Sequence, residues 1–219
     1  MAGLNSLKSI QPNCLRSDPL DLPRSLATLP MPDWRMPPRM LWTIGHSTRT
    51  IDEFITLLTT HGIQRIVDVR TIPRSRHNPQ FNREALAKSL TQAKLAYIHR
   101  PQLGGLRKAK KDSFNDGWKN ASFRGYADYM QTDEFWTALE ELIADGTDMK
   151  TAMMCAEAVP WRCHRSLIAD ALTVKKWTVW HIMSETKSDE HRLTSFAMIK
   201  DIRITYPAPT DSEGEPRLF

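Results

Sequence analysis

Short apolar runs alternate with amphipathic segments along residues 40–183, and this alternation restricts the fold more than any other feature of the sequence. The apolar runs expected to be strands cover residues 40–44, 63–69, 95–98, 151–155 and 177–183. Segments with helical spacing of apolar residues cover 51–61, 83–93, 123–130, 132–144 and 163–172. Strands that alternate with helices are typical of a mostly parallel sheet covered on both faces. The sequence therefore predicts one α/β domain of the Rossmann-like, three-layer type, with about five strands.

Capping residues mark three of the expected helix starts. Thr50 and Glu53 match the capping box, in which each side chain binds the other residue's free backbone N–H. Asn82 and Thr132 precede two further helices and are expected to cap them. Gly62 is well placed to end the first helix.

The proline distribution sets the expected domain limits. Residues 1–38 contain seven of the fourteen prolines and no sustained periodicity, which indicates a flexible leader. The α/β domain is expected over 39–205 and a flexible tail over 206–219. No apolar run approaches the ~18 residues that span a bilayer, so no membrane partner is expected. Three cysteines cannot form an even disulfide framework, and a reduced, cytoplasmic protein is the expectation.

Charge is distributed unevenly along the chain. Residues 70–111 hold eleven Lys/Arg and one acidic residue, a local net charge of +10, whereas 112–160 hold ten Asp/Glu and three Lys/Arg, a local −7. Such a basic block could attract an anionic small molecule or a nucleic acid. The alternative is that basic and acidic side chains pair within the domain. The oligomeric state is not indicated by the sequence.

Polar residues follow the expected strands at the points where each strand ends. They include His46 and Ser47, Asp68 and Arg70, His99 and Arg100, Cys155 and Glu157, and His181. Because parallel strands bring their carboxyl ends to one edge of a sheet, these side chains are expected to converge there. Ligands of open α/β sheets bind along the same edge.

The densest polar segment runs from Cys155 to Arg165, with a helix expected soon after Pro160. One interpretation is a thiolate site, in which Cys155 or Cys163 is the nucleophile and His164 or His46 handles the proton. A second is a metal site with Cys155, Cys163 and His164 as ligands, completed by Glu157 or His46, for which zinc or iron is possible. A third is a structural role for buried cysteines. Adjacent positions on a helix point apart, which would separate Cys163 from His164.

A second cluster follows the expected second strand. Asp68, Arg70, Arg74 and Arg76 bring up to three guanidinium groups and a carboxylate together, which suits an anion such as phosphate. The alternative is an internal Asp–Arg pair that stiffens the loop. Gly104 and Gly105 either let a backbone approach a ligand or form a plain turn. Walker A, Gly-x-Gly-x-x-Gly and Gly-x-Ser-x-Gly motifs are absent.

The candidate residues fall into two groups. Those with expected catalytic roles are His46, Asp68, Cys155, Glu157, Cys163 and His164. Those expected to bind substrate are Ser47, Arg70, Arg74, Arg76, Gly104, Gly105 and Arg165.

These motifs together resemble the family called domain of unknown function 488. The resemblance lies in Thr43-Ile-Gly-His-Ser47, Val67-Asp-Val-Arg70, Pro73-Arg-Ser-Arg76, Leu103-Gly-Gly105, Met154-Cys-Ala-Glu157 and Cys163-His-Arg165. It implies a single α/β domain with a polar cluster at these motifs, and it implies no activity. The residues themselves favour an enzyme that acts on a phosphate-bearing substrate, a nucleotide or nucleic acid. The alternatives are a non-catalytic nucleic-acid-binding or adaptor domain and a metal-dependent hydrolase.

Overall fold

The computed structural model describes residues 39–208, so the expected leader 1–38 and residues 209–219 of the expected tail lie outside the described part of the chain. The strands are β1 Met40–Gly45, β2 Arg65–Asp68, β3 Ala96–His99, β4 Thr151–Cys155, β5 Thr178–Ile182, β6 Ser188–Glu190, β7 Met198–Lys200 and β8 Arg203–Thr205. The α-helices are α1 Ile51–Thr60, α2 Arg83–Gln92, α3 Ala121–Tyr129, α4 Asp133–Asp148 and α5 Arg165–Val174. Three short 3₁₀ helices cover Pro79–Phe81, Pro101–Leu103 and Pro160–Arg162.

The five expected strands form a parallel sheet, and β6 adds a sixth strand that the sequence did not indicate. The strand order is β3-β2-β4-β1-β5-β6, with β1 between β4 and β5. Only β6 runs antiparallel, along β5. The strands β7 and β8 form a separate two-stranded hairpin. The prediction of a mostly parallel α/β sheet is therefore confirmed.

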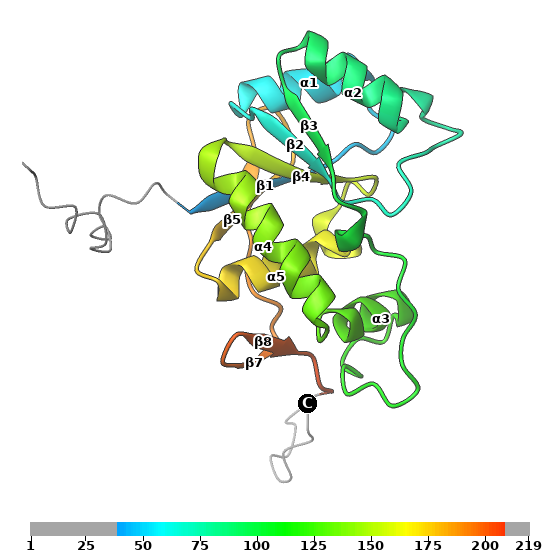
Figure 1. Cartoon of the computed structure of the whole chain (residues 1–219), viewed down its shortest axis with the longest axis vertical. Helices are drawn as coiled ribbons and strands as arrows, with labels where there is room; N and C mark the ends of the chain where they lie inside the picture. The colour runs from blue at the N-terminus through cyan, green and yellow to red at the C-terminus, as the bar shows by residue number, and fades with distance from the viewer. Residues whose placement is uncertain (1–38, 209–219) are drawn as a thin grey trace, which may run out of the picture. The chain divides into compact units, whose positions relative to one another are not determined.

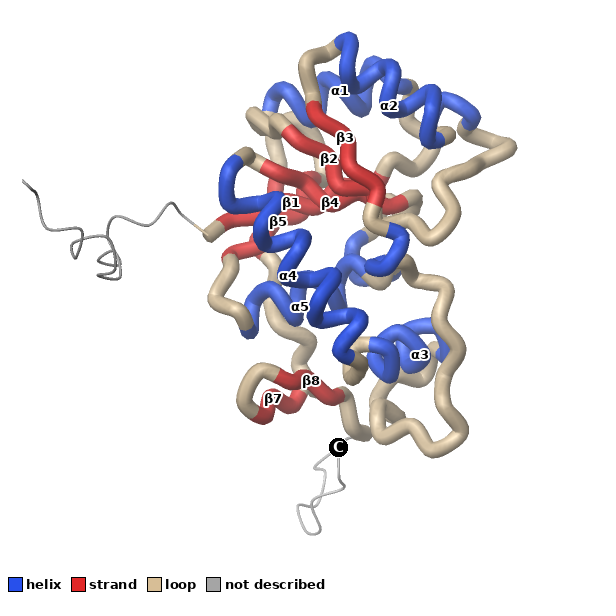
Figure 2. The backbone as a smooth tube through the Cα atoms, viewed as in Figure 1, coloured by secondary structure: helices blue, strands red, loops and turns tan. Residues whose placement is uncertain are grey.

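Helices cover both faces of the sheet, as the three-layer prediction required. In Figures 1 and 2, α1 and α2 lie on one side of the strands, and α4 and α5 lie on the other. Along β1, Leu41 packs into the core beneath α4 and α5, and Ile44 packs into the core beneath α1 and α2. Met153 and Met154 of β4 divide between the two cores in the same way. Burial on both faces explains why these strands are apolar throughout rather than alternating.

Two of the three expected caps are confirmed. Thr50 and Glu53 form the complete capping box of α1, and the Thr132 hydroxyl accepts the Phe135 N–H at the start of α4. Asn82 occupies the N-cap position of α2, but its side chain makes no capping bond. Its Oδ1 atom accepts the Ser75 N–H instead, so Asn82 fixes the preceding loop.

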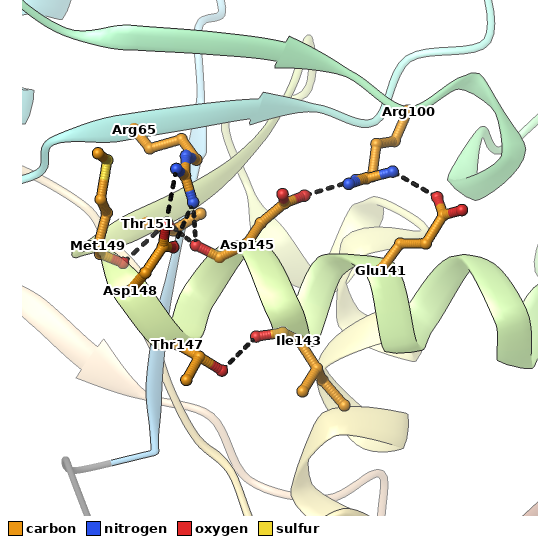
Figure 3. Close-up of polar contacts among 9 residues, drawn as sticks. All are labelled: Arg65, Arg100, Glu141, Ile143, Asp145, Thr147, Asp148, Met149 and Thr151. Atoms are coloured by element: carbon orange, nitrogen blue, oxygen red, sulfur yellow. Dashed lines mark hydrogen bonds and ion pairs between the residues drawn. The ribbon is translucent and has the colours of Figure 1, made fainter.

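Part of the basic block pairs with acids within the domain, as one of the two charge interpretations proposed. Figure 3 shows Arg100, which follows β3, against Glu141 and Asp145 of α4. Outside that block, Arg65 at the start of β2 pairs with Asp148 of the same helix at 2.7 Å. These contacts tie α4 to the sheet; both arginines are mostly buried, whereas their partners Glu141 and Asp148 are exposed to solvent.

Tyr206, the first residue of the expected tail 206–219, is packed within the described part of the chain. The Tyr206 side chain is fully buried, its hydroxyl donates to Asp170, and its backbone N–H donates to Asn115. These bonds anchor the end of the described chain. Among the described helices, none combines the length and the apolar character needed to cross a bilayer.

Candidate functional site

A pocket of about 650 Å³ opens at the carboxyl ends of β1, β2 and β4. Of the strand-end residues expected to converge, His46, Ser47, Arg70, Cys155 and Glu157 line this pocket, whereas Asp68, His99, Arg100 and His181 do not. Nine of the candidate residues line this pocket: His46, Ser47, Arg70, Arg74, Gly105, Cys155, Glu157, Cys163 and His164. Four do not line it, namely Asp68, Arg76, Gly104 and Arg165.

Cys155, Cys163 and His164 form the chemical centre of the pocket. The two Sγ atoms and one ring nitrogen of His164 all lie within 4.8 Å of one another. The Cys163 Sγ atom is 3.6 Å from His164 Nδ1. The expectation that His164 points away from Cys163 was wrong, because α5 begins only at Arg165 and both residues precede it.

The surroundings of Cys163 favour its thiolate form. A hydrogen bond from the Cys155 thiol lowers the pKa of Cys163 well below its ordinary value, and contacts with His164 and Arg165 act in the same direction against burial. The same hydrogen bond raises the pKa of Cys155, with burial adding to the effect. The Arg165 Nε–H donates to the Cys163 sulfur at 3.4 Å. Of the two thiols, Cys163 is therefore the one whose surroundings favour the thiolate, and Cys155 is the one that keeps its proton.

His164 completes this centre with one unpartnered nitrogen. Its Nε2 atom is buried and has no hydrogen-bond partner within residues 39–208. Its ring packs against Gly105, where an added Cβ atom would lie 2.5 Å from Nδ1. Gly105 therefore makes room for the imidazole, and Gly104, which packs in the same way on Thr71, is buried. The two glycines therefore allow close packing against Thr71 and His164 of the protein itself.

Asp68, Arg70 and His46 form a buried polar cluster beneath one wall of the pocket. Asp68 accepts bonds from Arg70 Nε at 2.9 Å, from Arg70 Nη2 at 2.6 Å and from the Tyr97 hydroxyl at 2.9 Å. Arg70 Nη1 lies 3.3 Å from His46 Nε2. The Asp–Arg pair is thus internal, as one interpretation proposed, and it holds a pocket-lining guanidinium in a single orientation.

His46 is a neutral ring in this cluster. Its Nδ1 atom lies 2.8 Å from the Ser47 carbonyl, which only a ring N–H can satisfy, and Nε2 is left to accept from Arg70. Burial lowers the pKa of His46 to about 4, and the Arg70 charge adds to this effect. The ring stacks on Phe81, with centroids 4.2 Å apart. Both nitrogens of His46 are therefore engaged within the protein.

Arg165 lies behind the pocket and holds its loop together. The side chain is 1% exposed. Besides Cys163, the guanidinium donates to the Thr43 hydroxyl at 3.1 Å and to the Glu157 carbonyl oxygen. Arg165 therefore holds neighbouring segments together from behind the pocket and does not line it. Glu157 itself is exposed at the pocket rim, and its carboxylate accepts the Val159 N–H at 3.2 Å.

The arginines that line the pocket differ from those expected to bind substrate. Arg70 and Arg74 line the pocket, Arg76 is exposed outside it, and Arg162 joins them from the 3₁₀ turn before Cys163. The sequence signal for Arg162 was its position beside Cys163. Ser47 adopts a left-handed conformation with φ of 50°, which is uncommon for a residue with a Cβ atom. Such strain is often found at functional sites.

A second set of polar residues was not recognised as a unit from the sequence. His181 was expected at the common edge, but it lies outside the main pocket, beside Thr43 in the β1–β5 register. It bonds to His191, which bonds to Asp170 of α5. The available signal was Asp170 itself, a single acid within the apolar run of residues 167–172.

Comparison of the sequence with known families places most of the described chain in a family. Residues 50–172, more than half of the chain, match the family described as Domain of unknown function DUF488. The chain belongs to this family. The resemblance inferred from the motifs is therefore confirmed, and the matched residues carry most of the pocket. Searches of curated proteins and of solved structures gave no match.

Proposed function

We propose that this DUF488 protein is an enzyme in which the Cys163 thiolate attacks a phosphate-bearing substrate held in the main pocket. The observation that carries the proposal is the environment of Cys163, whose sulfur accepts a guanidinium N–H and lies beside a second thiol in an open pocket. A stabilised thiolate with access to a ligand is the requirement for nucleophilic catalysis by cysteine.

The other residues divide the remaining tasks. Arg70, Arg74 and Arg162 would hold the anionic group of the substrate, with Arg70 fixed in place by Asp68. The thiolate electron pair would form the new bond to phosphorus, and the leaving oxygen would depart with its own electron pair. Cys155, which retains its proton, would supply that oxygen with a proton. Water would then release the phosphate from sulfur.

Two alkylating probes that differ in charge test this proposal. Iodoacetamide is neutral and iodoacetate is an anion, so an anion-holding pocket should favour iodoacetate at Cys163. We expect Cys163 to react faster than Cys155 at pH 6, because a thiolate of lowered pKa persists there. Lys-C peptides and tandem mass spectrometry would locate the label. Arg74→Ala and Arg162→Ala should each lower the iodoacetate-to-iodoacetamide ratio roughly threefold or more.

A matched variant controls for the loss of positive charge alone. Arg76 is exposed and outside the pocket, so Arg76→Ala should leave the ratio unchanged. Inorganic phosphate should slow labelling by iodoacetate. If Cys163 resists both reagents, or if it prefers the neutral one, the proposed function is wrong.

The same three donor atoms support a second candidate, a metal-dependent hydrolase. Two thiol sulfurs and an imidazole nitrogen within 4.8 Å match the donor types of a catalytic zinc site, and the pocket leaves room for water. His46 and Glu157, considered as further ligands, lie outside this group. Protein purified without chelator should then contain about one equivalent of zinc or iron, which Cys163→Ser should remove. Absence of metal together with rapid alkylation favours the thiolate enzyme.

A further inference from the structure

Five buried polar side chains outside the main pocket form one continuous chain of hydrogen bonds that ends at Cys163. Asp170 Oδ1 lies 2.8 Å from His191 Nε2, and His191 Nδ1 lies 3.0 Å from His181 Nε2. His181 Nδ1 lies 2.8 Å from the Thr43 hydroxyl, which accepts from Arg165 Nη1 at 3.1 Å. Each of these side chains is less than 9% exposed. The chain connects β5, α5 and β1 to the reactive thiol.

The chemistry of Asp170 fixes the direction of the first of these bonds. Its carboxylate also accepts from the Thr194 backbone N–H, the Thr194 hydroxyl and the Tyr206 hydroxyl. A carboxylate with these donors is an acceptor for His191 Nε2–H as well. One hydrogen is shared between His191 Nδ1 and His181 Nε2, and another between His181 Nδ1 and the Thr43 hydroxyl. In either direction of these two bonds the Thr43 oxygen keeps a lone pair that accepts from Arg165.

Arg165 connects this chain of hydrogen bonds to the Cys163 sulfur in the pocket. Its guanidinium is planar, so the bond from Nη1 to Thr43 fixes the plane in which Nε–H points at the Cys163 sulfur. The third nitrogen, Nη2, binds the Glu157 carbonyl in the pocket loop. Thr43 is therefore the side-chain anchor of Arg165 on the sheet.

The histidine pair has a pocket of its own, but its atoms are already engaged. His181 and His191 line a cavity of about 340 Å³ together with Trp118 and Trp161. Both ring nitrogens of both histidines have partners within the chain of bonds described above. Neither ring has a free lone pair for a ligand, which distinguishes this arrangement from a second acid–base site.

We propose that Thr43, His181, His191 and Asp170 are positioning residues, which act through Arg165 to hold its guanidinium against the Cys163 sulfur. The inference rests on the proposed function, because it concerns the reactivity of Cys163. Buried networks in which every donor and acceptor is satisfied restrict a side chain to one geometry.

Thr43→Val tests the central link, because valine keeps the shape of threonine and removes its hydroxyl. We expect Cys163 to react with iodoacetamide about five- to tenfold more slowly in this variant at a fixed pH near 7. Thr43→Ser, which restores a hydroxyl, should recover most of the wild-type rate. His191→Phe keeps a ring and breaks the chain two links from Arg165, and it should slow the reaction as well. All proteins are treated with chelator first.

Thr151→Val is the matched control. Thr151 is also a fully buried strand threonine, but its hydroxyl bonds to the Asp145 and Met149 carbonyls at the opposite end of β4. The Thr151→Val variant should be less stable than the wild type, and its Cys163 should be alkylated at the wild-type rate. Near-UV circular dichroism identifies the variants that keep the fold. If Thr43→Val unfolds, the alkylation rate of His191→Phe tests the positioning role instead.

The outcomes separate the two proposals. Cys163 that is unreactive in the wild-type protein contradicts the proposed function itself. A reactive wild-type Cys163 with unchanged rates in Thr43→Val contradicts the positioning role. A slow Thr43→Val with a normal His191→Phe also overturns the inference as stated, because positioning would then stop at Thr43. If alkylation of Cys163 slows equally in Thr151→Val, the slowing reflects a general loss of stability, and the positioning role is contradicted.

Discussion

At the scale of single residues, the site depends on polar groups that are kept uncharged or are held in one orientation by burial. His46 illustrates this, since its ring stacks on Phe81 and remains neutral beside the Arg70 guanidinium. Protonation would place a second cation against Arg70 in a buried position, which is costly. The neutral ring instead accepts a hydrogen bond from Arg70 and helps to orient it toward the pocket.

This neutrality makes stability depend on pH in a defined window. The pKa of His46 is about 4 in the folded protein, against an ordinary value of 6.5, and burial lowers the pKa of His181 to about 3. Between pH 6.5 and 5 the unfolded chain binds protons at these rings and the folded chain does not. The free energy of unfolding should therefore fall as pH decreases, by up to about 1.4 kcal/mol per pH unit for each ring.

Urea unfolding at pH 7.5, 6.0 and 5.0 measures this dependence. His46→Asn keeps an amide that can donate to the Ser47 carbonyl and removes the titrating ring, so its slope below pH 6.5 should be shallower than that of the wild type. A slope that is the same in both proteins would contradict the role of His46.

At the scale of elements, the junction between β1 and the loop after β4 shapes the pocket. His46 and Ser47 donate their N–H groups to the Cys155 and Ala156 carbonyls, which extends the β1–β4 pairing past the strand ends. Gly45 lies at this junction, where an added Cβ atom would be 1.9 Å from the Glu157 carbonyl oxygen. The absence of a side chain at Gly45 therefore allows the loop to fold across the end of β1.

Gly45→Ala should force the loop and the strand apart, because the nearest atoms belong to the backbone. We expect a loss of about 2 kcal/mol or more in the free energy of unfolding. Gly146→Ala is the matched change, since its nearest neighbours are side-chain atoms of Leu41 and Trp177 at 3.1 Å, and it should stay within about 1 kcal/mol of the wild type. If urea unfolding shows equal losses of stability in the two variants, the close contact of Gly45 with the Glu157 backbone is not what makes the position intolerant of a side chain.

Local signals predicted the elements well where the residue and its partner are close in sequence. The capping box at Thr50 and the cap at Thr132 depend on neighbours three residues away, and both were identified correctly. Asn82 was not, because the Ser75 N–H, seven residues earlier, competes for its side chain. The strand β6 could not be predicted, because a polar segment of three residues shows no apolar pattern.

At the scale of the whole molecule, parallel topology explains which parts of the site could be predicted. The rule that strand ends share one edge was enough to bring His46, Arg70 and Cys155 to one pocket. The partners of Arg165 could not be predicted, because the contact with Thr43 depends on the order in which β4, β1 and β5 lie side by side. Nothing in the local sequence specifies that order.

The place of β1 in that order has a consequence for how the domain can be divided. The family match begins at residue 50, after β1 has ended, and it stops before β5. A fragment cut at those limits would leave the inner edge of β4 with unpaired N–H and C=O groups, an open template for aggregation. It would also lack the threonine that anchors Arg165. The segment that matches the family thus leaves out β1, which pairs with both β4 and β5, and Tyr206, whose hydroxyl bonds to Asp170.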